Sequence, residues 1–180
     1  MAKFEKVSRF ADVDIAMPER KTAKSAGYDF VVAEDIILTP YDEQFDSMIP
    51  EDDDFTFEEP RSLDEVAALT KKFHAKPTLV STGMKCQLDD NQYLQLSIRS
   101  SCPLKDWLVL ANGVGIIDAD YYNNPDNEGE IFLQIINFSP YPIYLKQGDR
   151  IGQGIIMEYI RTEDDTATAV REGGFGSTGA

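Results

Sequence analysis

Short runs of alternating apolar and polar residues make up most of the chain from residue 78 onward. In a β-strand, successive side chains point to opposite faces, so such a run can bury one face and leave the other in water. Polar, Gly- or Pro-containing turns separate the runs and limit each strand to a few residues. The runs cover residues 78–88, 92–98, 108–118, 129–139 and 141–160. The sequence therefore predicts a mainly β protein built from many short strands.

The totals indicate one soluble domain. A chain of 180 residues, 42% of them hydrophobic, is long enough for a single sizeable core. No apolar run approaches the roughly 20 residues of a membrane span, and the first residues lack the apolar segment of a secretion signal. Cys86 and Cys102 are too few for a disulfide framework or a zinc site. We therefore expect a cytoplasmic protein with no membrane partner.

The net charge of −15 argues against direct binding of a nucleic-acid backbone, which needs clustered Lys and Arg. A polyphosphate substrate would also be repelled at long range. If one binds, then local basic residues, backbone amides and a divalent cation must reverse the local field.

The stretch from Arg99 to Tyr121 concentrates the chemically useful residues. Its sequence is RSSCPLKDWLVLANGVGIIDADY. Two short β runs meet at Asn112-Gly113, a step that favours the positive φ angles of a tight turn, so a hairpin is expected. Asp118 and Tyr121 then lie just past the second strand, beside exposed backbone amides. That arrangement suits hydrogen bonding to a planar ligand and activation of a water molecule. Asp-x-Asp-Tyr is, however, also typical of a solvated turn.

This stretch resembles motifs two and three of the homotrimeric dUTPases. Arg99-Ser100-Ser101 matches motif two, and Gly115 to Tyr121 matches motif three. The other three motifs follow the family order. Residues 17–30, ending in Ser-Ala-Gly-Tyr-Asp-Phe, resemble motif one, residues 148–153 resemble motif four, and residues 171–179 resemble motif five.

The resemblance implies a distorted jelly-roll β-barrel, assembled as a trimer with three active sites at subunit boundaries. It also implies hydrolysis of dUTP to dUMP and pyrophosphate, which keeps uracil out of DNA and supplies dUMP for thymidylate synthesis. Asp118 would be the general base, and Tyr121 would lie against the deoxyribose. Magnesium, chelated by the phosphates, would be held mostly through waters, with Asp29 as a water-mediated contact. The implied substrate-binding residues are Arg99, Ser100, Ser101, Asn112, Gly115, Ile117, Tyr121, Gln153, Arg171, Phe175, Gly176, Ser177 and Thr178.

Three departures from the family pattern stand out. Arg171 lies four residues before Phe175 rather than five, which leaves its role as a phosphate clamp open. Pro103 occupies a place where small residues are common. Tyr122-Asn123 replaces the usual Arg-Gly after the motif-three tyrosine.

Several alternatives stay open from the residues alone. Gln153 could be an ordinary strand residue, and the Gly-rich segment 171–180 could be a disordered tail rather than an arm that orders on a ligand. The same fold serves dCTP deaminases, which need a further catalytic Glu near the base. The chain could also be a regulatory binder that uses the nucleotide as a switch.

Residues 41–77 are predicted to be an insertion in the domain formed by residues 1–170. Nine carboxylates and no basic residue lie between Asp42 and Glu59. A capping box at Ser62–Glu65 then opens the longest α-helix expected, with His74 at its C-terminal end. A short helical segment is also expected within residues 99–106, and an edge strand over residues 3–10. This segment could simply cover the barrel, or its acidic and aromatic residues could dock a basic protein partner.

Overall fold

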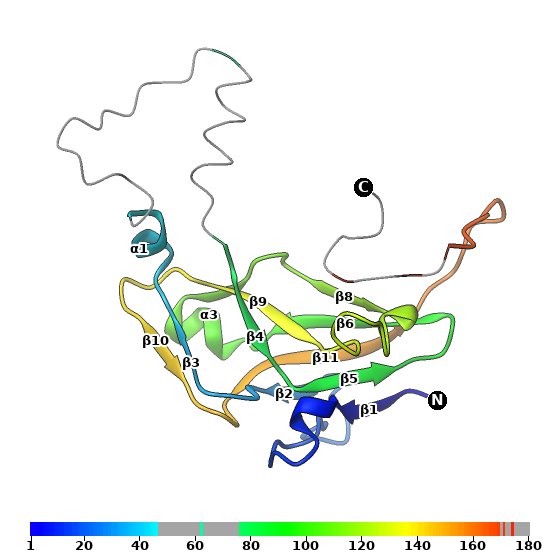
Figure 1. Cartoon of the computed structure of the whole chain (residues 1–180), viewed down its shortest axis with the longest axis horizontal. Coiled ribbons are helices and arrows are strands. Elements are labelled where there is room, and N and C mark those ends of the chain that lie inside the picture. Colours follow the sequence, from blue (N-terminus) through cyan, green and yellow to red (C-terminus); the bar gives the residue numbers. More distant parts are fainter. Residues whose placement is uncertain (47–61, 63–75, 170, 172–173, 175–180) are drawn as a thin grey trace.

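The computed structural model describes residues 1–46, 62, 76–169, 171 and 174. Figure 1 shows β-strands packed across one another in layers, with short helices at their ends. The first elements are β1 (Lys3–Lys6), the 3-10 helix η1 (Ser8–Phe10), β2 (Tyr28–Val31), β3 (Ile36–Leu38) and α1 (Tyr41–Asp46). The middle elements are β4 (Thr78–Ser81), β5 (Met84–Gln87), β6 (Gln92–Ile98), α3 (Ser101–Asp106) and β7 (Leu108–Leu110). The last are β8 (Gly115–Asp118), the 3-10 helix η2 (Ala119–Tyr121), β9 (Phe132–Asn137), β10 (Ile143–Leu145) and β11 (Arg150–Glu158).

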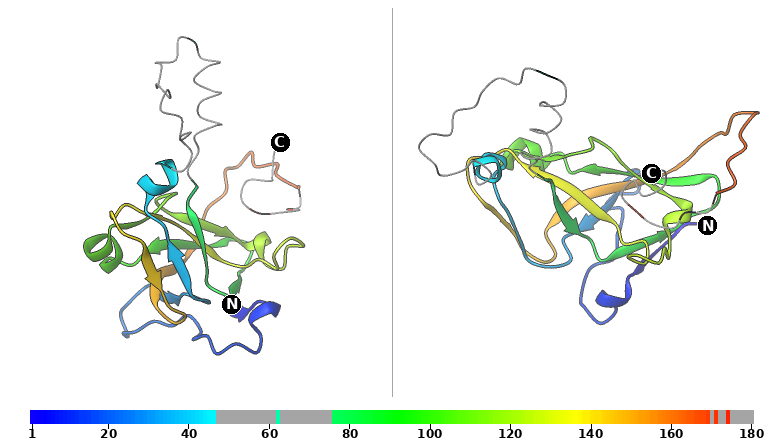
Figure 2. Two further views of the ribbon diagram at one scale, coloured as in Figure 1. Left: turned by 60° about the vertical axis from the view of Figure 1, so that its left-hand side comes forward. Right: turned by 45° about the horizontal axis from the view of Figure 1, so that its top comes forward.

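The strands form two larger sheets and two short ladders. One sheet has the order β2-β11-β6-β8, and the other has the order β4-β9-β7. The pairs β1-β5 and β3-β10 complete the arrangement, and every strand pair is antiparallel. Figure 2 shows the two larger sheets turned toward each other from two further directions. The expectation of a mainly β protein with short strands is confirmed.

The core lies between these sheets. Alternation along β9 buries Leu133, Ile135 and Asn137 and leaves the intervening side chains partly exposed, as period-two patterning requires. The largest fully buried side chains are Phe30, Leu38, Met84, Leu94, Leu96, Leu108, Ile131, Leu133, Ile135 and Ile151.

The predicted hairpin at Asn112-Gly113 is wrong. β7 pairs with β9, whereas β8 pairs with β6, so the two runs belong to different sheets. A two-residue hairpin of the favoured type needs positive φ at both central residues, and of these two only Gly113 has it, at 68°. Gly113 N–H donates to the Leu110 carbonyl at 2.9 Å, which makes a tight corner between the sheets. That corner is the way the chain crosses from one layer to the other.

Some of the predicted strands and helices have the expected bounds, and others do not. The edge strand expected over residues 3–10 stops at Lys6, and the run 78–88 is two strands, β4 and β5. The short helical segment expected within residues 99–106 is present as α3. The predicted helix beginning near Ser62 lies outside the described residues, apart from Ser62 itself. Sequence reasoning missed α1, which falls in what was predicted to be an acidic loop (Figure 1).

None of the helices in the described part of the chain combines the length and the apolar character that crossing a membrane requires.

We expect Leu94→Ala to lower the free energy of unfolding by about 2–5 kcal/mol, because Leu94 is 0% exposed in the central strand β6. Urea or thermal unfolding at one fixed protein concentration would measure this. Ile160→Ala, at a side chain 98% exposed, is the control and should change stability by no more than about 0.5 kcal/mol. Equal effects of the two substitutions would contradict this description of the core.

Candidate active site

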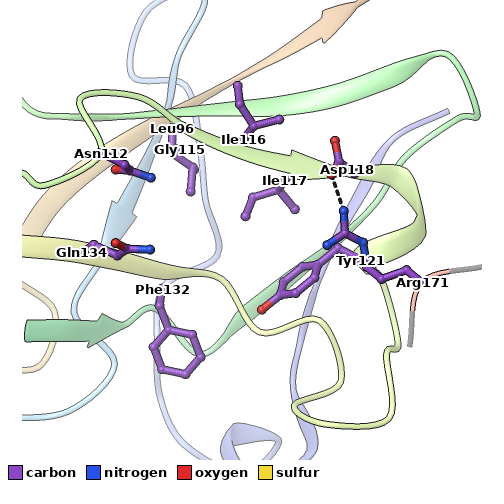
Figure 3. Close-up of a pocket in the computed structure, with 10 residues that line it drawn as sticks. All are labelled: Leu96, Asn112, Gly115, Ile116, Ile117, Asp118, Tyr121, Phe132, Gln134 and Arg171. Atoms are coloured by element: carbon purple, nitrogen blue, oxygen red, sulfur yellow. Dashed lines mark hydrogen bonds and ion pairs between the residues drawn. The ribbon is translucent and has the colours of Figure 1, made fainter. Parts of the chain in front are cut away.

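A cavity of about 180 Å³ lies between β8 and β9, beside the end of β8 (Figure 3). It is lined by Leu96, Asn112, Gly115, Ile116, Ile117, Asp118, Tyr121, Phe132, Gln134 and Arg171. Asn112, Gly115, Ile117, Asp118, Tyr121 and Arg171 were all predicted as site residues from sequence. The fold therefore gathers motif three and the start of motif five around one cavity.

Asp118 is the last residue of β8, and strand pairing fixes where it lies. In the antiparallel register, Asp118 stands opposite Tyr93 of β6, and Gly115 stands opposite Leu96. The chain then enters η2, with Asp118 in an extended conformation at its N-cap. Its side chain is 49% exposed. A carboxylate at the rim of a cavity and open to water can accept a proton from a bound water.

Tyr121 forms a rigid wall of the same cavity. It is 6% exposed, and its hydroxyl donates a hydrogen bond to the Glu130 carbonyl at 3.0 Å. Burial, which disfavours the phenolate, is the main reason that the pKa of Tyr121 is raised above its ordinary value. The hydroxyl therefore stays neutral at physiological pH and acts as a fixed structural group.

Arg171 holds the two acidic side chains that follow β8. Its Nη2 lies 2.5 Å from Asp118 Oδ2 (Figure 3), and its Nε lies 2.8 Å from Asp120 Oδ1. The guanidinium also lies over the Tyr121 ring, 5.9 Å from its centroid. In this structure the first basic residue of motif five therefore contacts the predicted base.

A second group of predicted residues gathers around Asp29. The carboxylate of Asp29 lies 3.8 Å from Arg99 Nε and 3.3 Å from Arg150 Nη1. Gln153 pairs with Asp29 across β2 and β11, and with Ser97 across β11 and β6. Motifs one, two and four thus meet on one sheet. Two guanidiniums, one side-chain amide and the exposed hydroxyl of Ser100, at the start of α3, can together bind phosphate oxygens.

The two groups lie at opposite ends of β6. Asp118 stands opposite Tyr93, near the start of that strand, whereas Arg99 follows directly after its last residue. Six residues of extended chain span about 20 Å. Arg99 and Ser100 of one chain therefore cannot contact the same phosphate that a water on Asp118 of that chain attacks.

The carboxylate of Asp29, predicted to contact magnesium through a water, lies beside two guanidiniums in this structure. Among the residues that the structure describes, no cluster of three or more His, Cys, Asp or Glu side chains could hold a metal ion. The guanidiniums around Asp29 suit phosphate oxygens, which would in turn hold a magnesium ion together with waters.

Sequence reasoning assigned no role to five residues in these groups, one of which, Ile116, lies between two predicted residues of motif three. Arg150 lies inside the Gly-Asp-Arg-Ile run of motif four, which was a usable signal. Leu96, Phe132 and Gln134 are alternating residues of ordinary strands, and nothing in the sequence distinguishes them. Phe175, Gly176, Ser177 and Thr178, predicted to bind substrate, lie outside the described residues.

Comparison with known proteins agrees with this arrangement. The sequence model of the dUTPase family matches residues 65–179. The deoxyuridine 5′-triphosphate nucleotidohydrolase of Lactococcus lactis is 35% identical over 179 residues, which cover 98% of this chain and 97% of that protein. This chain is a member of the dUTPase family. Motif one lies outside the segment matched by the family model.

Solved dUTPase structures show the same fold. The crystal structure of the Streptococcus mutans dUTPase matches with a TM-score of 0.67 and 33% identity, covering 89% of this chain and 98% of that one. The dUTPase of phage phi11 of S. aureus matches with a TM-score of 0.61 over 98% of this chain and 99% of that one. At 18% identity, the phage protein supports the fold alone. The predicted jelly-roll type of β fold is confirmed.

We expect Gly27→Ala to act through Gln153. A Cβ on Gly27 would lie 2.6 Å from Gln153 Oε1, so the end of that flexible side chain would have to move. Stability should change little, whereas kcat/KM for dUTP should fall about 10- to 100-fold, as for a lost hydrogen bond to a charged group. Gln153→Ala should have a similar effect, and the double variant should be no worse than either.

Ser25→Ala is the matched control, because its hydroxyl donates only to the Thr22 carbonyl nearby. Kinetics of Gly27→Ala that match wild type would show that Gln153 does not serve the site.

Proposed function

We propose that the protein hydrolyses dUTP to dUMP and pyrophosphate at a site built around Asp118. The observation that carries the proposal is the half-exposed Asp118 carboxylate on the rim of the cavity that Tyr121 and the Asn112-Gly113 corner also line. Membership of the dUTPase family supports the reaction and the substrate.

Asp118 acts as the general base. It takes a proton from a water while the water oxygen forms a bond to the α-phosphorus. The bond from that phosphorus to the bridging oxygen breaks, and the electron pair leaves with pyrophosphate. Arg171 occupies Oδ2 of Asp118, which leaves Oδ1 for the water. Positioned proton transfer of this kind contributes about 10²–10⁴-fold to the rate.

The cavity binds the nucleoside and selects for its base and sugar. Asn112 and Gln134 direct their side-chain amides into it (Figure 3). These groups match the donors and acceptors on the edge of uracil. Cytosine would leave them unpaired in a tight site, which is a strong basis for rejection. The buried ring of Tyr121 lies against the deoxyribose and excludes a 2′-hydroxyl.

The triphosphate is bound by the group around Asp29. Arg99, Arg150, Ser100 and Gln153 present charge and hydrogen-bond donors. We assign this group to a second copy of the chain, because Arg99 lies about 20 Å from the base within one copy. Magnesium chelated by the phosphates would neutralise the departing pyrophosphate. Phe175, Gly176, Ser177 and Thr178 of motif five would then cover the nucleotide.

A closed trimer accounts for the sharing of sites. A head-to-tail contact that closes on itself gives each copy the same two half-sites. Leu79 on β4, Val114 just before β8 and Ile116 on β8 are apolar side chains that are each more than 40% exposed. Burial of such residues against a neighbouring copy would stabilise the assembly.

The rival activity of a dCTP deaminase is less well supported. It needs a glutamate near the base, and the cavity described here has none among its lining residues. Glu130 lies close by in sequence, but its buried carboxylate is bound by Arg9 and by Ser81.

Residues 41–77 remain a proposed docking segment for a basic protein partner, on the strength of their charge and aromatic content. An unchanged set of proteins captured with and without residues 42–76 would remove this proposal. A cytoplasmic location is proposed from the two free cysteines, Cys86 and Cys102, which fit a reducing compartment.

We expect the wild-type protein to release pyrophosphate from dUTP far faster than from dCTP or dTTP in the presence of magnesium. Asp118→Asn should retain dUTP binding and lose at least about 100-fold in kcat, since an amide cannot accept the proton of the water. Asp126→Asn is the control, because Asp126 lies outside the cavity. Near wild-type turnover in Asp118→Asn would refute the assignment of the base, and faster turnover of dCTP would refute the substrate.

A further inference from the structure

The loop 122–128 separates the site tyrosine from strand β9 and closes on itself. Asn124 N–H donates to the Tyr121 carbonyl, Asn123 N–H donates to the Glu128 carbonyl, and Glu128 N–H donates to the Asn124 carbonyl. At Gly129 the chain returns to its starting point, where a Cβ would lie 2.5 Å from the Tyr121 carbonyl oxygen. The loop is therefore compact, and its two ends meet beside Tyr121.

Side chains of two asparagines connect the interior of this loop to the tyrosine ring. Asn127 Nδ2 donates to the Tyr121 hydroxyl at 2.8 Å. Asn127 Oδ1 accepts from Gly129 N–H at 3.1 Å and from the buried Asn124 Nδ2 at 2.8 Å. Because the amide of Asn127 is bonded at both of its atoms, its orientation is fixed.

The tyrosine hydroxyl is consequently held on two sides. It accepts from Asn127 and donates to the Glu130 carbonyl at 3.0 Å. A phenol has one strong donor and accepts readily in the ring plane, so these two bonds set the plane of the ring. A Cβ on Gly174 would lie 2.9 Å from Tyr121 Cε2, so the backbone at Gly174 also lies close against the ring.

The loop itself is attached to the N-terminal part of the chain. The Glu128 carboxylate accepts hydrogen bonds from both the backbone N–H and the hydroxyl of Ser8, at 3.1 and 2.8 Å. Tyr122 donates to Glu5, and Lys85 donates to Asn123. These contacts make the loop a rigid support from which Asn127 reaches the ring.

We propose that Asn127 is a positioning residue that fixes the Tyr121 ring and thereby sets how strongly the enzyme rejects ribonucleotides. The proposal rests on the proposed function, in which the ring lies against the deoxyribose. A steric wall excludes a 2′-hydroxyl only if it cannot tilt away, and two bonds at the far end of the ring prevent that tilt. Sugar selectivity is then a property of the loop 122–128 as well as of the tyrosine.

The experiment compares kcat/KM for dUTP and for UTP. Asn127→Ala should lower the dUTP-to-UTP ratio by about three- to tenfold, which is the effect of losing one hydrogen bond. The loss should come from faster UTP hydrolysis, with the dUTP values little changed. Asn127→Asp keeps the size and the acceptor but removes the donor, so it should lower the ratio in the same way if Asn127→Ala folds poorly.

A double-mutant cycle with Tyr121→Phe distinguishes positioning from a general structural role. Without the hydroxyl, Asn127→Ala should cause no further change in the ratio, since both substitutions remove the same contact. Tyr122→Phe is the matched control, because it removes a hydroxyl bond that anchors the same loop but does not touch Tyr121.

The outcomes separate the two proposals. A wild-type enzyme that does not prefer dUTP over UTP would refute the role of Tyr121 itself. A selective wild-type enzyme whose ratio is unaltered by Asn127→Ala and Asn127→Asp would refute the role of Asn127 alone. A ratio that falls equally with and without the Tyr121 hydroxyl would also overturn it, because Asn127 would then act by another route.

Discussion

The antiparallel pairing of β6 with β8 on one edge and β11 on the other determines where the proposed base and the phosphate-binding group lie relative to each other. The β8 pairing brings Asp118 opposite Tyr93, and the β11 pairing brings Gln153 opposite Ser97. A shift of one residue in either register would turn the affected side chains to the opposite face of the sheet. Buried Leu94 and Leu96 fix that register, because they leave the core if the strand slips. The hydrophobic core and the site are thus specified by the same strand.

Electrostatics explains how a strongly acidic chain can bind a triphosphate. The net charge of −15 is distributed over the chain, whereas Arg99 and Arg150 lie together around a single counter-ion, Asp29. One carboxylate between two guanidiniums leaves a local excess of positive charge. Arg171 instead lies between two carboxylates, Asp118 and Asp120, and stabilises them against mutual repulsion at the place where the attacking water is proposed to bind.

Local sequence patterns predicted the strands, the short helix α3 and the motif residues, because these depend on period-two alternation and on residue type. The corner at Asn112-Gly113 was predicted wrongly because the choice of pairing partner is a tertiary property. In the structure β7 pairs with β9 and β8 pairs with β6. Sequence likewise gave no sign that Arg150 shares Asp29 with Arg99, or that Asn127 reaches the Tyr121 hydroxyl. Both contacts join residues through pairings and loop closures that alternation does not encode. The separation of Asp118 from Arg99 could be calculated only once the register of β6 was known.

The central claim is that one catalytic site takes its base and its phosphate-binding residues from different copies of the chain. The most direct measurement is dUTP turnover of assemblies formed by refolding equal amounts of Asp118→Asn and Gln153→Ala chains together. Each variant alone should be strongly impaired. Random mixing should restore about a quarter of wild-type turnover, because about one site in four would combine an intact Asp118 with an intact Gln153. No recovery in assemblies shown to contain both chains would mean that each site is built within one copy, and would contradict the account.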